Sequence, residues 1–238
     1  MRKPLITLMA LASLGLSGAA LAKVSADEAG RLGQDLTPVG AERNGNAAGT
    51  IPAWNGGLSA APDGWTPGAQ EIDPFPGDKP LFTITAQNMA EHEQFLSDGQ
   101  KALLTTYPDT YKLPVYPSRR TAAYPQWVYE KLKENALNAT LIEDGNGVRN
   151  TIATSPFPIP KEGLEVVWNH ILRFRGEQVL FRSAFASPTA NGDFTPIMTE
   201  YSYYFAYSEP GAKLEDIDNK IFYLKTRILS PAKLAGTL

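Results

Sequence analysis

The sequence predicts an α+β fold in which helices come first along the chain and an antiparallel sheet follows. Three observations support this fold class. Apolar residues recur at helical spacing within residues 88–104 and 125–137. From Thr140 onward the period shifts toward two, as in half-buried strands. Residues 144–147, Asp-Gly-Asn-Gly, predict a hairpin turn because glycine and asparagine accept the positive φ that such turns require.

The first 22 residues are typical of a signal peptide. Arg2 and Lys3 form a short basic start, and an apolar run follows that ends in small residues. We therefore expect cleavage between Ala22 and Lys23 and export of the mature chain. The chain has no cysteine, so we expect neither a lipid at the cleavage site nor a disulfide.

The composition narrows the classes of function. The chain has 22 basic and 25 acidic residues, so nothing suggests the basic stripe of a nucleic-acid-binding protein. Two histidines and no cysteine leave few soft metal ligands, so we expect no metal site. No phosphate-binding loop, nucleophile motif or fixed acid–base pair stands out, so we expect no cofactor, no catalytic residue and no enzymatic activity.

After the signal peptide, residues 23–80 form the first part of the mature chain. A capping-box pattern at Ser25 and Glu28 predicts a short helix that ends near Gly33. Residues 36–80 are then so rich in glycine and proline that long regular elements are excluded. We expect an extended arm that lies on the surface of residues 81–238, the main domain.

Three aromatic residues of this arm distinguish it from a disordered linker: Trp54, Trp65 and Phe75. Packing against the domain is the favoured interpretation, because such rings bury large areas. Docking on a partner protein and, for the two tryptophans, stacking on a sugar remain alternatives.

The main domain begins with helices. Residues 88–96 predict one helix, and a second capping-box pattern at Ser97 and Gln100 starts another, which ends before Pro108. A loop rich in tyrosine and proline follows. Pro125 then opens the best amphipathic helix of the chain. Residues 163–170 predict a further short helix.

Strand candidates occupy the remaining chain. The predicted hairpin pairs residues 139–143 with residues 148–153, and three further strands are expected at residues 178–187, 197–208 and 221–228. Alternation places Tyr201, Tyr203, Phe205 and Tyr207 on one face, and Phe181 and Phe185 on one face of the preceding strand.

This aromatic set has two interpretations. Periodicity alone favours a hydrophobic core beneath helices. The alternative is a groove for an apolar ligand, in which Arg182, Arg173 or Arg175 would meet an anionic head group. A three- or four-stranded sheet that ended near Leu238 would leave a bare edge, so we expect the natural protein to continue.

Five segments of the sequence carry a resemblance to a known family. They are residues 49–57 (GTIPAWNGG), 73–85 (DPFPGDKPLFTIT), 155–160 (SPFPIP), 163–170 (GLEVVWNH) and 229–236 (LSPAKLAG). Together they resemble the exported Gram-negative proteins catalogued as domain of unknown function 1329. The resemblance covers nearly all of the mature chain. Family chains run about twice this length, so the sequence resembles their N-terminal half.

The resemblance implies a curved antiparallel sheet closed by helices, as in the LolA/LolB lipoprotein carriers, here as an incomplete half-barrel. It also implies the periplasm as the location, and a transporter of the RND type and an outer-membrane protein as partners. We expect peripheral contact with a membrane at most. The leading hypothesis is a periplasmic carrier for a lipid or hydrophobic molecule. The alternatives are a non-catalytic interaction subunit and an enzyme that acts on polysaccharide or lipid.

Overall fold

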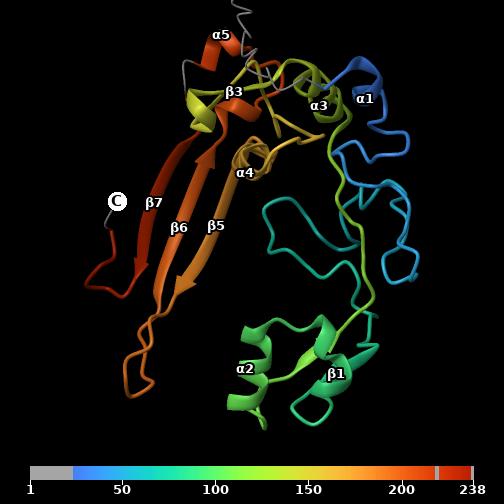
Figure 1. Ribbon diagram of the computed structural model, residues 1–238. Helices are drawn as coiled ribbons and strands as arrows, with labels where there is room; N and C mark the ends of the chain where they lie inside the picture. The colour runs from blue at the N-terminus through green and yellow to red at the C-terminus, as the bar shows by residue number, and fades with distance from the viewer. Residues whose placement is uncertain (1–23, 218–219, 237–238) are drawn as a thin grey trace, which may run out of the picture.

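The computed structural model describes residues 24–217 and 220–236 (Figure 1). The predicted signal peptide and its cleavage site between Ala22 and Lys23 lie outside the described residues. None of the described helices combines the length and apolarity that a membrane crossing requires. Helices and short antiparallel sheets are mixed, and no described sheet closes into a barrel.

The first helix, α1 (Ala26–Gly30), begins with the predicted capping box. Ser25 Oγ accepts a hydrogen bond from Glu28 N, and Glu28 Oε2 accepts one from Ser25 N at 3.0 Å. The helix packs on α3 (Gln126–Asn138), and Ala29, Leu32 and Leu36 bury their side chains there with Ala136. A single turn of helix is thus fixed at both its start and its apolar face.

Residues 31–81 form no helix and no strand, as their glycine and proline content predicts. This irregular segment runs from α1 toward β1, beside the stretch that leads from β2 to α3 (Figure 1). Backbone hydrogen bonds join the two stretches: Leu58 N donates to Thr121 O at 2.9 Å. Gly40 approaches another segment so closely that a Cβ atom there would lie 1.6 Å from Pro158 O.

The next elements differ in part from the prediction. The expected helix over residues 88–96 is a 3₁₀-helix, η1 (Met89–Phe95), and it leads into α2 (Asp98–Thr106) through the predicted capping box at Ser97. Two strands were not predicted: β1 (Phe82–Ile84) pairs with β2 (Leu113–Val115). Pro114 argued against a strand, but an edge position in a two-stranded sheet tolerates proline.

The predicted hairpin is confirmed as β3 (Thr140–Ile142) and β4 (Gly147–Arg149), joined by a 3₁₀ turn, η2 (Glu143–Gly145). Asp144 and Gly145 both have positive φ, as the sequence requires of such a turn. The predicted short helix is also confirmed as α4 (Gly163–Leu172).

The largest sheet consists of β5 (Gln178–Phe185), β6 (Ile197–Tyr204) and β7 (Tyr223–Ser230), in that order and all antiparallel. In Figure 1 the three strands lie side by side, with α4 near one end of β5. Strand β6 ends at Tyr204, four residues earlier than predicted. A 3₁₀ turn, η3 (Ala206–Ser208), and the short helix α5 (Leu214–Ile217) lie between β6 and β7.

Candidate binding site on the three-stranded sheet

One face of the β5–β6–β7 sheet collects aromatic and aliphatic side chains. In the strand register Phe181 lies opposite Tyr201, and Val179 lies opposite Tyr203, which pairs in turn with Leu224. Opposed residues share a face. This aromatic face therefore consists of Val179, Phe181, Phe185, Ile197, Tyr201, Tyr203, Leu224 and Ile228, together with the rings of Phe205 and Phe222 described next.

The rings on the aromatic face are stacked on one another. Phe181 stacks on Tyr201 with ring centroids 4.9 Å apart, and Tyr203 stacks on Phe205 at 5.4 Å. Phe222 lies 5.6 Å from Tyr203 and 6.0 Å from Phe205. Stacked pairs hold each other in place beyond the effect of burial, so the rings form a continuous surface.

The aromatic face is open. Phe181 keeps 42% of its surface exposed and Phe185 keeps 67%, and Phe222 and Leu224 are exposed as well. Large apolar side chains of a well-packed core would be almost fully buried. Of the two interpretations of this strand, a closed core is therefore contradicted for these outer residues.

Arg175 lies at the Phe205 end of the aromatic face. Its guanidinium carbon is 5.8 Å from the Phe205 ring centroid, and Nη2 donates to Ile171 O at 3.3 Å. Burial and, to a smaller extent, the nearby charge of Arg173 lower the pKa of Arg175. Among the described residues Arg175 has no carboxylate in ion-pair contact. The face thus ends in a cation that no described carboxylate neutralises.

Arg182, the predicted head-group contact, lies on the opposite face of the sheet. It pairs with Glu200 in the register, and its Nη2 is 2.9 Å from Glu200 Oε2. Arg227 binds the other oxygen of the same carboxylate at 2.7 Å. The hydrogen bond from Arg182, with the charge of Arg227, lowers the pKa of Glu200. The structure therefore does not bring Arg182 together with the aromatic face.

Tyr207 was wrongly placed on that face. It belongs to η3 rather than β6, and its side chain is 5% exposed in a core with Ile152, Ala153 and Leu172. Its hydroxyl donates to Thr154 O at 2.8 Å and lies 2.9 Å from Thr151 Oγ1. Burial raises the pKa of Tyr207, so the phenol stays neutral. Tyr207 acts as a buried anchor for η3.

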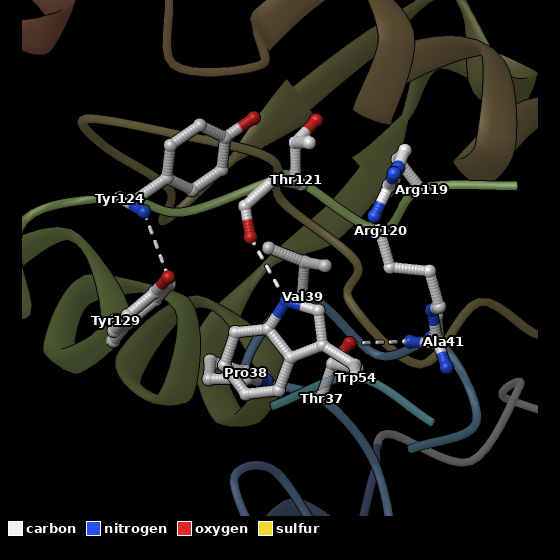
Figure 2. A pocket seen from close by; sticks show the side chains of 11 residues that line it. Thr37, Pro38, Val39, Ala41, Trp54, Arg119, Arg120, Thr121, Tyr124 and Tyr129 are labelled. Atoms are coloured by element: carbon white, nitrogen blue, oxygen red, sulfur yellow. Dashed lines mark hydrogen bonds between the residues drawn. The ribbon is translucent and has the colours of Figure 1, made fainter. Parts of the chain in front are cut away.

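Trp54 packs within the chain, at a cavity of about 320 Å³ that the irregular segment forms with residues 119–124 (Figure 2). Its Nε1 donates to Ala122 O at 2.9 Å. Arg120 lines the same cavity and donates to Glu42 O at 2.6 Å and to Arg43 O at 3.0 Å. These polar groups hold two chain segments together.

Phe75 and Trp65 lie farther along the irregular segment. The guanidinium carbon of Arg119 is 4.6 Å from the Phe75 ring centroid, and Arg119 also pairs with Asp78 at 2.5 Å. The neighbouring residues Arg119 and Arg120 thus fix the segment at two separate places. Trp65 is half-buried, and among the described residues its Nε1 has no hydrogen-bond partner.

Sequence reasoning missed Ile197, Phe222, Leu224 and Ile228 as members of the aromatic face. Strand alternation was the available signal for three of them: Ile197 has the parity of Tyr201 and Tyr203 in β6, and Leu224 and Ile228 have the same parity in β7. Phe222 lies just before β7. Within residues 24–217 and 220–236, histidine and acidic side chains form no group of three that could hold a metal ion. The aromatic face thus presents exposed apolar side chains to its surroundings.

Comparison with known proteins identifies relatives to which no function is assigned. The family model described as "Protein of unknown function (DUF1329)" matches residues 83–238. A relative in Pseudomonas aeruginosa, "Uncharacterized protein PA3922", is 43% identical over 218 residues, which cover 92% of this chain and 48% of the relative. The chain thus spans about half the length of that curated relative. No solved structure matches it.

Proposed function

This chain belongs to the DUF1329 family, and we propose that it is a binding protein for a hydrophobic cargo, held on the aromatic face of the β5–β6–β7 sheet. The observation that carries the proposal is the stacked row of Phe181, Tyr201 and Tyr203. Phe181 is exposed and the two tyrosines are half-buried, and the row ends on the buried ring of Phe205. A ligand that covered this row would remove apolar surface from water at about 25 cal/mol per Å².

The cargo we propose is an amphiphile with an anionic head. Its hydrocarbon part would lie along Phe181 and Tyr201, and its head would reach Arg175 beyond Phe205. Arg175 supports this orientation of the cargo, with the anionic head toward Phe205, because it is a cation that no described carboxylate neutralises. A guanidinium offers several donors in a planar fork, which suits carboxylate and phosphate groups.

The predicted signal peptide would place this activity outside the cytoplasm, in the periplasm. We also propose that the sheet is part of a LolA/LolB-like half-barrel, since it presents a wide apolar face with α4 near one end. A three-stranded sheet also leaves two edge strands whose backbone groups could pair with further strands.

The alternative, in which the irregular segment docks on a transporter or an outer-membrane protein, has less support. Trp54 and Phe75 are already engaged by Ala122 O and by Arg119, so their rings are not free to anchor a partner. Interface anchors are typically aromatic side chains that fill a pocket of the partner.

A pair of exposed residues in β5 tests the proposal. Phe185 is 67% exposed on the aromatic face and Leu180 is 64% exposed on the opposite face. Phe185→Ser removes a contact worth about 2 kcal/mol, and we expect about 30-fold weaker binding of a fluorescent fatty acid. Leu180→Ser is the control and keeps wild-type affinity.

Native mass spectrometry of the protein purified from the periplasm provides a second measurement. We expect a co-purifying lipid in the wild type and in Leu180→Ser, and reduced occupancy in Phe185→Ser. Recovery of ligand-free wild-type protein that takes up no fatty acid in titration would refute the proposal. Equal weakening by both substitutions would refute the assignment to the aromatic face.

A further inference from the structure

The face of the β5–β6–β7 sheet opposite the aromatic rings is basic. Strand alternation places Leu180, Arg182, Met198, Glu200, Ser202, Lys225 and Arg227 on this basic face. Two neighbouring cross-strand rows of this face, Leu180–Ser202–Lys225 and Arg182–Glu200–Arg227, contain three cations and one carboxylate. The chain as a whole has more acidic than basic residues, so positive charge is concentrated here against the overall balance.

The single carboxylate of these rows holds two of the cations in fixed positions. The Glu200 side chain is only 11% exposed, and it accepts from Arg182 Nε at 2.9 Å and from Arg227 Nη2 at 2.7 Å. The two arginines themselves are 61% and 50% exposed. Each therefore keeps further N–H donors available to solvent, and the cluster retains a net positive charge.

Lys225 adds a third cation in the neighbouring row. It lies opposite Ser202, which in turn lies opposite Leu180. Lys225 is exposed and forms no ion pair with any described residue. The exposed Leu180 thus lies next to Arg182 on β5 and in the same row as Lys225, with Ser202 between them, so this part of the face combines positive charge with an apolar side chain.

The basic face is positive at the Arg182–Arg227 end and has acidic side chains near its other end. At that other end Tyr204 stacks on Tyr223 with ring centroids 6.0 Å apart, and Tyr204 OH donates to Glu209 Oε2 at 2.6 Å. The hydrogen bond to Glu209 raises the pKa of the Tyr204 phenol, and the charge of Glu177 nearby adds a smaller contribution. An anionic partner would therefore contact the Arg182–Arg227 end.

We propose that the basic face binds the surface of an anionic lipid bilayer, with the Arg182–Arg227 end against the head groups. Three cations lie on one face of the sheet and so can contact a layer of phosphates together, and each Lys or Arg near such a surface adds to the attraction. Leu180 can enter the head-group region, as apolar side chains of peripheral proteins do. The aromatic face stays open meanwhile, so this inference does not depend on the proposed cargo.

A charge-reversal pair tests the inference. Lys225→Glu is compared with Lys112→Glu, which changes the net charge equally at an exposed residue beside β2, away from the sheet. The readout is co-sedimentation with vesicles of phosphatidylglycerol or of phosphatidylcholine. We expect binding to phosphatidylglycerol alone, and about 30-fold weaker partitioning for Lys225→Glu, which corresponds to two charges at about 1 kcal/mol each. Lys112→Glu should bind like the wild type.

Added salt should weaken the binding, because exposed charges are screened. Three results would overturn the inference. One is equal binding to both kinds of vesicle, and another is an equal effect of the two substitutions. The third is a concentration-dependent dimer that Lys225→Glu abolishes, since the basic face would then bind a second copy. Loss of fatty-acid binding in Phe185→Ser tests the cargo proposal separately.

Discussion

Single side chains fix the ends of the shortest elements in this protein. Glu28 completes the capping box of α1 and also binds Lys161 Nζ at 2.5 Å, far along the sequence. These hydrogen bonds, with that from Lys161 the largest, lower the pKa of Glu28 to about 2 from 4.5. One half-buried carboxylate therefore supports both a local turn and a long-range contact.

The pH dependence of stability follows from this shift. A lowered pKa in the folded state means that Glu28 stabilises the protein above its unfolded-state pKa of 4.5, and that this contribution is lost as the pH falls toward about 2. We expect Glu28→Gln to destabilise the protein at neutral pH and to have little effect near pH 2. Urea unfolding across this range measures the difference.

The control for Glu28 is Asp27→Asn, which removes a charge from the same first turn but no ion pair of the described residues. It should change the free energy of unfolding little at any pH. An effect of Glu28→Gln that stayed constant across the range would contradict the role of the ionised carboxylate.

At the scale of elements, the irregular segment can lie against residues near Pro158 only because its backbone comes very close to them at a glycine. Gly40 and Gly33 have similar positive φ, +91° and +84°, but only Gly40 faces another chain segment, at Pro158. Positive φ costs an L-residue about 1–2 kcal/mol. A Cβ atom at Gly40 would in addition overlap Pro158 O.

We therefore expect Gly33→Ala to lower the free energy of unfolding by about 1–2 kcal/mol and Gly40→Ala by more than twice as much. Chemical denaturation measures both values, and hydrogen exchange at residues 155–160 reports whether the segment separates. Equal losses would show that backbone conformation, rather than contact with Pro158, determines the role of Gly40.

Local patterns could predict most elements but not where each one ends. The capping boxes at Ser25 and Ser97 and the turn at Asp144 depend on residues a few positions apart, so sequence alone identifies them. The end of β6 depends on Tyr207, whose hydroxyl bonds to Thr154, 53 residues away. A contact at that separation leaves no trace in local periodicity.

The candidate site was predicted in part for the same reason. Alternation correctly grouped Phe181, Phe185, Tyr201 and Tyr203, and the same alternation places Arg182 on the other face. Arg175 lies outside any strand, so its position beside Phe205 could not follow from strand periodicity. It depends on how the chain leaves α4.

At the scale of the whole molecule, Asn135 links two buried clusters. It precedes Ala136, which packs with Leu32 and Leu36, while its own side chain binds the main chain of the cluster around Ile152. Asn135 Oδ1 accepts from Ile152 N at 3.1 Å, and Nδ2 donates to Ile152 O at 2.9 Å. The side-chain amide of Asn135 thus pairs with both backbone groups of Ile152, as a residue of a neighbouring strand would do.

Asn135→Ala should be destabilising, because it leaves the buried N–H of Ile152 without a partner, whereas Ile152 O keeps its hydrogen bond from Thr154 N. One such buried group costs about 1–3 kcal/mol, so we expect a loss of about that size. Thermal and urea unfolding measure it. Asn138→Ala, on the exposed side of the same helix, is the control and should change stability by less than about 0.5 kcal/mol. Similar losses for both would contradict the linking role.

The connectivity of the β5–β6–β7 sheet has a consequence for folding kinetics. Its strands follow one another along the chain and pair only with sequence neighbours, whereas the bonds of Trp54 to Ala122 and of Arg120 to Glu42 close loops of 68 and 78 residues. Short loops cost less entropy to close than long ones. The β5–β6–β7 sheet can therefore assemble early, and we expect the attachment of the irregular segment by Arg119 and Arg120 to follow it.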